Sequence, residues 1–420
     1  RLRREVPALA WQLARLRFGT IGPTNHFVEL HARMQSFNFN TTPGIRFGED
    51  LSVKSAEEVC KKLGSKILFV TDPGLVKLGL IDNTIKALKV NSEVLIFDSV
   101  EADPSLKTLM LCVEEGKNFK ASGVIGFGGG SSMDTAKLTA LLLGSGENIH
   151  EAWGVANAKG PRLPLVLYPT TSGTGSEITP ISIITQDDLE KKGVSSPLIL
   201  PDLAIMDPLL TLGLPPHITA ATGIDAMVHA IESYASKSLN NNLISKMLAK
   251  EALNLLGESI TTAVTNGKDV TARSNMLLGS MLAGASFGNS PVAGVHALAY
   301  PIGGTFHVPH GLSNAIVLPY VLRFNITEQS AAKLYSEIAP IIFPDINTST
   351  STQDIASNFI EKLSNLSSEL GLEQRLRDVN IPESACETMA KDAMKQTRLL
   401  INNPKEISEK DAYDIYRSAW

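Results

Sequence analysis

The feature that most constrains the fold is an alternation of short apolar runs with amphipathic stretches, which begins near Phe37. Apolar runs bounded by Gly, Pro, Asp or Asn are typical of buried strands. They occur at 66–71, 93–97, 123–127 and 164–168. Helical patterns such as those at 56–63 and 105–116 lie between them. Strands that alternate with helices predict a parallel sheet with helices on both faces.

The pattern changes after the Pro215-Pro216 pair, where strand-like runs nearly vanish. Long segments rich in Ala, Leu and Met follow at 226–235, 243–256, 272–285 and 331–339. We therefore expect an α/β domain at 37–214, a helical domain at 215–420 and an N-terminal extension at 1–36. The expected fold class is α/β followed by all-α, with the boundary near Leu214.

The overall composition excludes several classes of protein. With 43% hydrophobic and 19% charged residues, the chain resembles a globular protein with a large core. A formal net charge of -5 argues against a nucleic-acid partner, because a phosphate-binding surface needs clustered Lys and Arg. No apolar run approaches the roughly 20 residues of a membrane helix. The three scattered cysteines suit a reducing compartment.

The first twenty residues are rich in Arg and contain a single acidic residue, Glu5. An Arg-rich, amphipathic start is compatible with an organelle transit peptide, although such peptides usually contain Ser. A basic surface helix or tail is an equally good interpretation. The protein is expected to be cytoplasmic, or to lie in the mitochondrial matrix if residues 1–36 are a transit peptide.

Two polar loops follow neighbouring predicted strands and suggest a nucleotide site. In GVIGFGGGSSMDTAK (123–137), a strand leads through Gly128, Gly129 and Gly130 into a helix. Backbone N–H groups without Cβ atoms can approach a pyrophosphate closely, and the helix N-terminus adds positive potential. The second loop is PTTSGTGSE (169–177). A tight strand–helix turn would also use glycine, but two such loops at carboxyl strand ends favour a dinucleotide.

Asp72 ends the predicted strand at 66–71 and has two interpretations. A carboxylate at a strand end can accept hydrogen bonds from ribose hydroxyls and repel a 2′-phosphate. Asp-Pro-Gly (72–74) is also sufficient turn chemistry by itself, and this is the stronger interpretation for Asp72 taken alone.

A metal site is suggested by Asp225 and His229, which share one helix face in GIDAMVHAIESY. Their neighbours are apolar, so both polar side chains would lie near the core, where they need a partner. An ion pair would suffice for these two. However, His296 and His310 lie in GVHALAYPIGGTFHVPHG, where Pro and Gly stop one helix from carrying both. Three imidazoles and one carboxylate suit Fe²⁺ or Zn²⁺.

Taken together, these segments resemble the iron-containing (group III) alcohol dehydrogenase family from about Phe37 to the end. The match runs through GFGGGSSMDTAK, PTTSGTGSE, PDLAIMDP, LPPHITAATGIDAMVHAIESY, HALAYPIGGTFHVPHGLSNAIVLP and the closing NNPKEISEKDAYDIYRSAW. Several long motifs in the right order make the resemblance specific. It implies a Rossmann-like domain, a helical domain (a dehydroquinate synthase-like fold) and an active site between them.

The resemblance also implies roles for individual residues. The implied metal ligands are Asp225, His229, His296 and His310. The implied cofactor-binding residues, beyond the glycines and Asp72, are Ser131, Asp134, Thr170, Thr171, Thr174 and either Lys191 or Lys192. We expect NAD rather than NADP, Fe²⁺ with Zn²⁺ as the alternative, a small alcohol or aldehyde as substrate, and a homodimer or higher homo-oligomer.

One position departs from many family members, which carry another His four residues after the third ligand. Here that residue is Tyr300, and His307 is a possible substitute for proton transfer. Some members do have Tyr there, including the hydroxyacid–oxoacid transhydrogenases, although these have a longer segment before the last ligand. Tyr300 and His307 are therefore the candidate catalytic side chains.

Proteins with other activities share this domain organisation. A dehydroquinate synthase must hold a substrate phosphate, whereas the segments beside the predicted ligands contain almost no Lys or Arg. This favours a neutral alcohol. Transhydrogenase-type activity, glycerol dehydrogenase-like activity and a non-catalytic metal-binding relative stay as alternatives. We expect a metal-dependent alcohol dehydrogenase or aldehyde reductase that uses NAD(H).

Overall fold

The computed structural model describes residues 36–186 and 190–420. Residues 37–420 form one compact unit. Both interpretations of the N-terminal extension, transit peptide and basic helix, therefore concern residues that lie outside the described part of the chain, Ser36 excepted.

The core of the first half is a six-stranded sheet in which all pairings are parallel. Its strand order is β1 (Ile45–Phe47), β9 (Leu203–Met206), β6 (Leu165–Pro169), β4 (Gly123–Gly128), β2 (Lys66–Val70) and β3 (Glu93–Phe97). The four predicted strands are confirmed, with ends that differ by at most one residue. Sequence reasoning missed the short strands β1 and β9.

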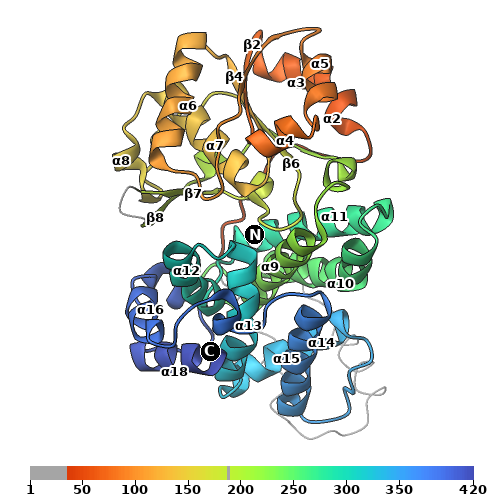
Figure 1. The fold of residues 1–420 in the computed structure, drawn as a ribbon, viewed down its shortest axis with the longest axis vertical. Helices are drawn as coiled ribbons and strands as arrows, with labels where there is room; N and C mark the ends of the chain where they lie inside the picture. The colour runs from red at the N-terminus through yellow and green to blue at the C-terminus, as the bar shows by residue number, and fades with distance from the viewer. Residues whose placement is uncertain (1–35, 187–189) are drawn as a thin grey trace, which may run out of the picture. The chain divides into compact units, whose positions relative to one another are not determined.

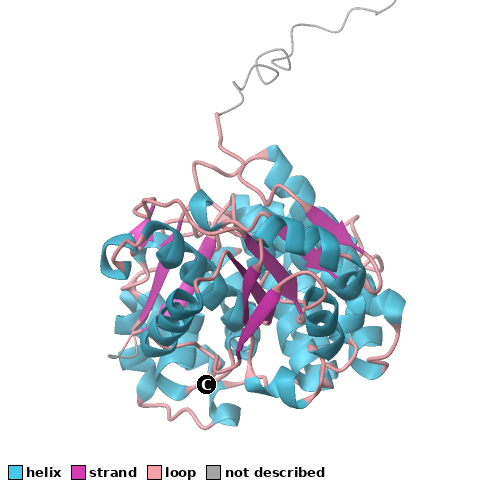
Figure 2. Ribbon diagram, turned by 90° about the horizontal axis from the view of Figure 1, so that it is seen from above, coloured by secondary structure: helices cyan, strands magenta, loops and turns pink. Residues whose placement is uncertain are grey.

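Alternation along the strands creates two cores, one on each face of the sheet. Ile67 and Phe69 of β2 belong to a cluster with α3 (Ala56–Leu63) and α5 (Asp82–Leu88). Leu68 and Val70 point the other way, into a cluster with α6 (Leu106–Phe119) and α7 (Gly130–Ser145). Figure 2 shows helices flanking the strands on both sides. Because both faces of the sheet are buried, the sequences of its strands are nearly continuous apolar runs.

A second, smaller sheet carries polar groups that matter for the site. In it, β7 (Ile181–Thr185) pairs antiparallel with β8 (Lys191–Ser195), and β5 (Gly154–Val155) runs parallel to β8. Ile184 and Val194 pack against Leu138 and Leu141 of α7. The short helices of this half are α2 (Leu51–Lys54), α4 (Pro73–Lys77) and α8 (Ile149–Ala152).

Helices form the second half, drawn from green to blue in Figure 1. The central one is α9 (Pro216–Ala235), which is buried along most of its length although it carries the polar residues Asp225, His229 and Glu232. The helices packed against it are α10 (Leu243–Thr265), α11 (Val270–Phe287), α12 (Gly294–Phe306), α13 (His310–Asn325) and α14 (Gln329–Ile342). The helices α15 (Thr352–Glu369), α16 (Ala385–Ala393), α17 (Thr397–Leu400) and α18 (Glu409–Ala419) pack against α12, α13 or α14.

The predicted fold class is confirmed: a parallel sheet with helices on both faces is followed by a helical part. The last strand ends at Met206 and α9 begins at Pro216, on either side of the boundary predicted near Leu214. Within 36–186 and 190–420, none of the helices has the length and apolarity to cross a membrane. The three cysteines are buried and free.

Candidate active site

One cavity, of about 240 Å³, contains residues from both halves of the chain. From the sheet half come Gly130, Ser131, Asp134, Thr174 and Lys191. From the helical half come Asp225, His229, His296, Tyr300, His310 and Arg398. Most of the residues singled out in the sequence therefore meet at a single place.

The sheet side of this cavity is built by the two predicted loops. Parallel pairing sets Gly128 of β4 beside Pro169 of β6, so both loops leave the same edge of the sheet. Gly128 has φ +150°, and a Cβ there would lie 2.7 Å from the Ser132 hydroxyl, so only glycine fits. The N–H of Thr170 donates to the Gly128 carbonyl at 3.0 Å. Strand register thus brings the two loops together.

The glycines that follow leave the first turn of α7 open. Gly129 is the residue before the helix, and its nearest contact for an added Cβ is Thr171, at 3.6 Å. A Cβ on Gly130 would lie 2.9 Å from the Thr174 methyl group. This helix N-terminus has no side-chain cap, and helix N-termini bind phosphate oxygens through their backbone N–H groups.

Asp134 of α7 joins the second loop to the small sheet. Its carboxylate accepts hydrogen bonds from the Ser176 hydroxyl at 2.6 Å and the Ile183 N–H at 2.8 Å. Its Oδ1 lies 3.8 Å from Nζ of the buried Lys137, which donates to the carbonyls of Thr179 and Ile181. Burial raises the pKa of Asp134 and lowers that of Lys137 to about 8. Asp134 therefore holds together the loops that line the cavity.

Asp72 caps a short helix, which confirms the turn interpretation, and it also lies beside the glycine loop. One carboxylate oxygen, Oδ1, caps α4 by accepting the Leu75 N–H at 3.0 Å. The other, Oδ2, lies 3.4 Å from the point where a Cβ on Gly128 would be. The turn and the position beside the glycine loop are thus compatible, because the two oxygens point to different places.

The two lysine candidates separate on β8, where successive side chains point to opposite faces. Lys191 lines the cavity, and its Nζ lies 2.6 Å from the Asp103 carboxylate. Lys192 is not among the lining residues; its Nζ lies 3.7 Å from Glu190. Of the pair, the structure brings only Lys191 to the cavity.

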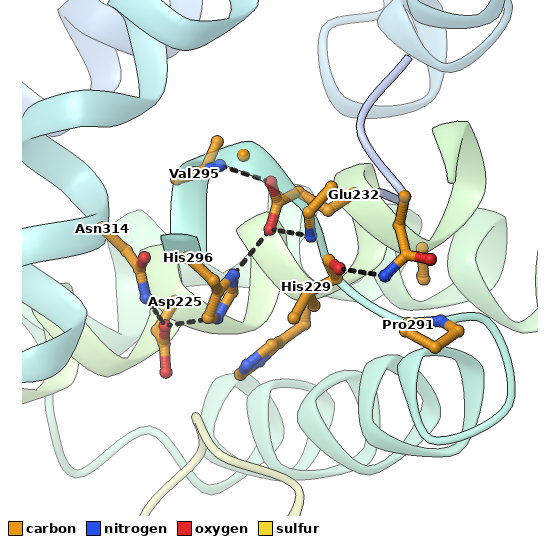
Figure 3. A network of polar contacts seen from close by, with 12 residues as sticks. Asp225, His229, Glu232, Pro291, Val295, His296 and Asn314 are labelled. Carbon is orange, nitrogen blue, oxygen red and sulfur yellow. Dashed lines mark hydrogen bonds and ion pairs between the residues drawn. The ribbon is translucent and has the colours of Figure 1, made fainter. Parts of the chain in front are cut away.

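The helical side gathers the four predicted metal ligands. Figure 3 shows Asp225 and His229 on α9 beside His296 on α12, and the ligand atoms of these three lie within 4.8 Å of one another. His310, the first residue of α13, places Nε2 at 3.8 Å from Asp225 Oδ1. The chain does turn between the two last ligands, as predicted. However, Pro301 lies inside α12, and the break comes at 307–309.

Each imidazole is oriented by a second polar group. Glu232 accepts the Nδ1 hydrogen of His296 at 2.6 Å and also the N–H groups of Ala293 and Val295 (Figure 3). His229 Nδ1 donates to the Gly173 carbonyl at 3.2 Å. With both Nδ1 atoms protonated, the Nε2 lone pairs are free for a ligand. Asn314 donates to Asp225 Oδ1 at 2.7 Å and to His310 Nε2 at 3.2 Å.

This donor set fits a divalent metal ion. His296 Nε2 is buried and has no hydrogen-bond partner among the described residues, which is costly unless something binds there. Burial lowers the pKa of His229 and of His310 to about 3, so both rings are neutral and present lone pairs. One carboxylate and three imidazoles make up a ligand set for Fe²⁺ or Zn²⁺.

The two candidate catalytic side chains have different positions. Tyr300 lines the cavity, with its ring 6.0 Å from that of His310, and burial raises the pKa of its hydroxyl. His307 is the exposed residue that ends α12, with φ 56°, and it is not among the lining residues. The interpretation of His307 as the proton-transfer group is therefore corrected: the turn that ends α12 directs it to solvent.

Sequence reasoning missed several residues of the site. Glu232 and Asn314 each lie about one helical turn after a ligand, His229 and His310 respectively, so the spacing could have revealed both. Arg398 could not have been found this way, because it reaches the cavity from α17, far along the chain. It also corrects the sequence argument for a cavity almost without Lys or Arg.

Comparison with known proteins decides the family. A model of iron-containing alcohol dehydrogenase matches residues 42–208, and a model of the C-terminal part of the Fe-containing alcohol dehydrogenase family matches residues 219–420. The chain belongs to the iron-containing alcohol dehydrogenase family. The predicted family and fold are thereby confirmed.

The relatives of this alcohol dehydrogenase are named for different substrates. It is 42% identical to long-chain-alcohol dehydrogenase 1 of Geobacillus thermodenitrificans, over 86% of this chain and 91% of the relative. It is 34% identical to 1,3-propanediol dehydrogenase of Citrobacter freundii, over 90% and 97%. A crystal structure of 1,3-propanediol oxidoreductase has 33% identity and a TM-score of 0.87, and covers 92% of this chain and 100% of its own.

One further solved structure bears on the cofactor. It is the sulfoacetaldehyde reductase of Bifidobacterium kashiwanohense in complex with NAD⁺, with 27% identity, a TM-score of 0.80 and coverage of 91% and 98%. The predicted class of activity is confirmed: this chain is a metal-dependent oxidoreductase of alcohols and aldehydes. The roles of its individual residues stay predictions.

Proposed function

We propose that this protein transfers a hydride between NAD(H) and a short alcohol or aldehyde, with Fe²⁺ held by Asp225, His229, His296 and His310. The observation that carries the proposal is the buried Nε2 of His296, which has no hydrogen-bond partner among the described residues and lies in the same cavity as Gly130 at the start of α7. A bound divalent ion supplies Lewis-acid polarisation of the substrate oxygen, and the nicotinamide supplies or accepts the hydride.

The protein's own residues provide position and exclusion of water. The N-terminus of α7 and the second loop hold the cofactor phosphates on the sheet side. Phe287, Val292 and Leu399 line the same cavity as the ligands and keep that part of it apolar. The Tyr300 hydroxyl remains protonated at neutral pH, because burial raises its pKa, so it serves as a hydrogen-bond donor.

We propose NAD(H) as the preferred cofactor, on the basis of Asp72. Its Oδ2 faces the Gly128 loop, where a 2′-phosphate would meet a like charge. Replacing Asp72 with Gly should lower the ratio of kcat/KM with NADH to kcat/KM with NADPH by about tenfold, because one repulsive charge pair near the surface is removed. The measurement is kcat/KM with each cofactor. A wild-type preference for NADPH would refute this assignment.

We also propose that the protein forms a homo-oligomer. The edge strand β1 exposes Ile45 (38%) and Phe47 (41%), and an exposed strand edge is open to pairing. Leu239, Leu243 and Met247 form a second exposed apolar group at 80%, 64% and 62%. Light scattering should give at least a dimer for the wild type, and Phe47→Asp should shift it towards monomer. A monomeric wild type would contradict the proposal.

The activity is tested by following NADH absorbance at 340 nm with Fe²⁺-loaded protein and a panel of short aldehydes. We expect oxidation of NADH that depends on added Fe²⁺. A panel that includes glycerol in the reverse direction, and a hydroxyacid with an oxoacid acceptor, separates the two related activities. Failure to oxidise NADH with any aldehyde, at full metal occupancy, would overturn the proposed function and favour a non-catalytic relative.

A further inference from the structure

Arg398 brings a positive charge into the cavity that holds the metal ligands. It lies on α17, which packs against α12, the helix that carries His296 and Tyr300. Its Nη2 lies 3.7 Å from the point where a Cβ on Gly193 of β8 would be, and its charge opposes the effect of burial on the pKa of the Tyr300 hydroxyl. Arg398 is an exposed residue, but it also lines the cavity together with the predicted metal ligands.

The other charged groups of this cavity have partners. Lys191 pairs with Asp103 at 2.6 Å. Asp134 accepts two hydrogen bonds and lies near Lys137, and Asp225 accepts one from Asn314. Within 36–186 and 190–420, the Arg398 guanidinium makes neither an ion pair nor a hydrogen bond. The cavity thus contains one cation whose charge is not compensated by the residues described.

An arginine has two properties that suit it to binding a substrate anion. Its planar guanidinium donates paired hydrogen bonds that match the spacing of oxygens in a carboxylate or a sulfonate. Its positive charge also raises the local concentration of anions in a cleft with apolar walls, here Phe287, Val292 and Leu399. A neutral alcohol would make no use of either property.

We propose that Arg398 binds an anionic group on the substrate, so that the preferred substrates are short aldehydes or alcohols that carry a carboxylate or a sulfonate. This inference rests on the proposed function, because it assigns the substrate class of the same site. In the reductive direction the carbonyl carbon accepts a hydride from NADH and the carbonyl oxygen gains a proton. NAD⁺ and the alcohol are the products, and the anionic group is unchanged.

The test compares anionic and neutral aldehydes on the Fe²⁺-loaded enzyme with NADH. Succinic semialdehyde carries a carboxylate, sulfoacetaldehyde carries a sulfonate, and butanal is the neutral reference. In the wild type, kcat/KM should be higher for at least one anionic aldehyde than for butanal. Arg398→Gln should lower that value by ~100-fold, the size of losing a charge-assisted pair of hydrogen bonds, and should leave butanal within a few-fold.

Two further variants control for charge and for folding. Arg398→Lys keeps the charge but loses the paired geometry, and it should recover part of the loss. Lys395→Gln removes a positive charge from the same segment; Lys395 is exposed, pairs with Asp392 and is not among the lining residues, so this variant should behave as wild type. NADH affinity should be unchanged in Arg398→Gln. An equal loss of NADH affinity would show that Arg398 serves the cofactor and would overturn the proposal.

A second readout separates failure of this inference from failure of the proposed function. Calorimetric titration of the Fe²⁺-loaded protein with 4-hydroxybutyrate should detect binding in the wild type and at least ~30-fold weaker binding in Arg398→Gln. If no aldehyde reacts but wild type still binds 4-hydroxybutyrate more tightly than Arg398→Gln does, the proposed activity is refuted and the proposed anion site is supported. If butanal reacts best and 4-hydroxybutyrate binding does not depend on Arg398, the activity stands and this inference is wrong.

Discussion

The two sides of the cavity are constructed in different ways. On the sheet side, the backbone forms most of the site. Gly128 adopts a conformation that favours glycine, and the register of β4 and β6 places the two loops side by side. On the helical side, buried side chains converge, and each is fixed by another polar group, as His296 is by Glu232. A site in which backbone groups bind the ligand is disrupted by added side-chain volume. A site in which side chains bind the ligand is disrupted when one of them loses its charge or its orientation. Substitutions on one side should therefore leave the other side's ligand largely unaffected.

The largest effect is expected for Asp225→Asn. The amide is close to isosteric with the carboxylate, but it removes the negative ligand from the buried cluster that Asp225 forms with His229 and His296. Metal content should fall to background and turnover by ~10³-fold or more, because the Lewis acid is lost. NADH affinity should stay within a few-fold, because Asp225 lies on α9. Elemental analysis and NADH fluorescence titration provide the two values, and a parallel loss of NADH binding would break the comparison.

On the sheet side, Gly129→Val should give the converse result. An added Cβ at Gly129 meets only Thr171, at an ordinary 3.6 Å, so the fold should persist. The side chain blocks the close approach of pyrophosphate to the start of α7, and the NADH Kd should rise by roughly 100-fold. Metal content should match the wild type.

Gly213→Ala is the matched control for that substitution, because an added Cβ there has no neighbour within 4 Å among the described residues. It should leave NADH affinity and metal content unchanged. If Gly129→Val bound NADH like the control, the glycine loop would be a structural turn only.

On the sheet side, the sequence predicted the elements whose pattern is local, but not the features that depend on strand pairing. The strand at 93–97 and the helix at 56–63 were predicted to the residue, because their apolar pattern and their boundaries are local. The choice between Lys191 and Lys192 depended on the face of β8, which only its pairing with β7 determines. None of the strands of the small sheet was predicted, and one of them, KKGVS, has little apolar character.

On the helical side, the residues that meet at the predicted metal site could be predicted from local spacing, but Arg398 could not. Asp225 and His229 share a helix face at a spacing visible in the sequence. Arg398 enters the cavity through the packing of α17 against α12, a contact between distant segments that no local pattern encodes. His307 was placed wrongly for a related reason: its nearness to His310 in sequence did not reveal the left-handed turn that directs it outward.

A smaller effect than loss of a ligand is expected for Glu232→Gln. Glu232 accepts from the His296 ring and from the Ala293 and Val295 N–H groups through two oxygens, and an amide offers only one. Loss of such an orienting carboxylate typically lowers metal affinity by about 10- to 100-fold. A chelator competition assay should give this shift at unchanged NADH affinity. Wild-type metal affinity would mean that Glu232 only packs α9 against α12.

The smallest effect is expected for His307→Ala, which should keep turnover within about twofold of the wild type between pH 6 and 9, because His307 is exposed and outside the cavity. Tyr300→Phe, within the cavity, should lower turnover more than His307→Ala does. A loss of ~100-fold in His307→Ala with the metal retained would instead identify His307 as a general acid–base group.

The central claim is that one metal ion on the helical side and one nicotinamide cofactor on the sheet side form a single reaction centre. The most direct test is an anaerobic titration of metal-free protein with Fe²⁺, while oxidation of NADH by an aldehyde is followed. Activity should rise linearly and level off at about one Fe²⁺ per chain in the wild type, and His296→Ala should stay inactive throughout. Full activity without metal, or the same titration curve in His296→Ala, would contradict the account.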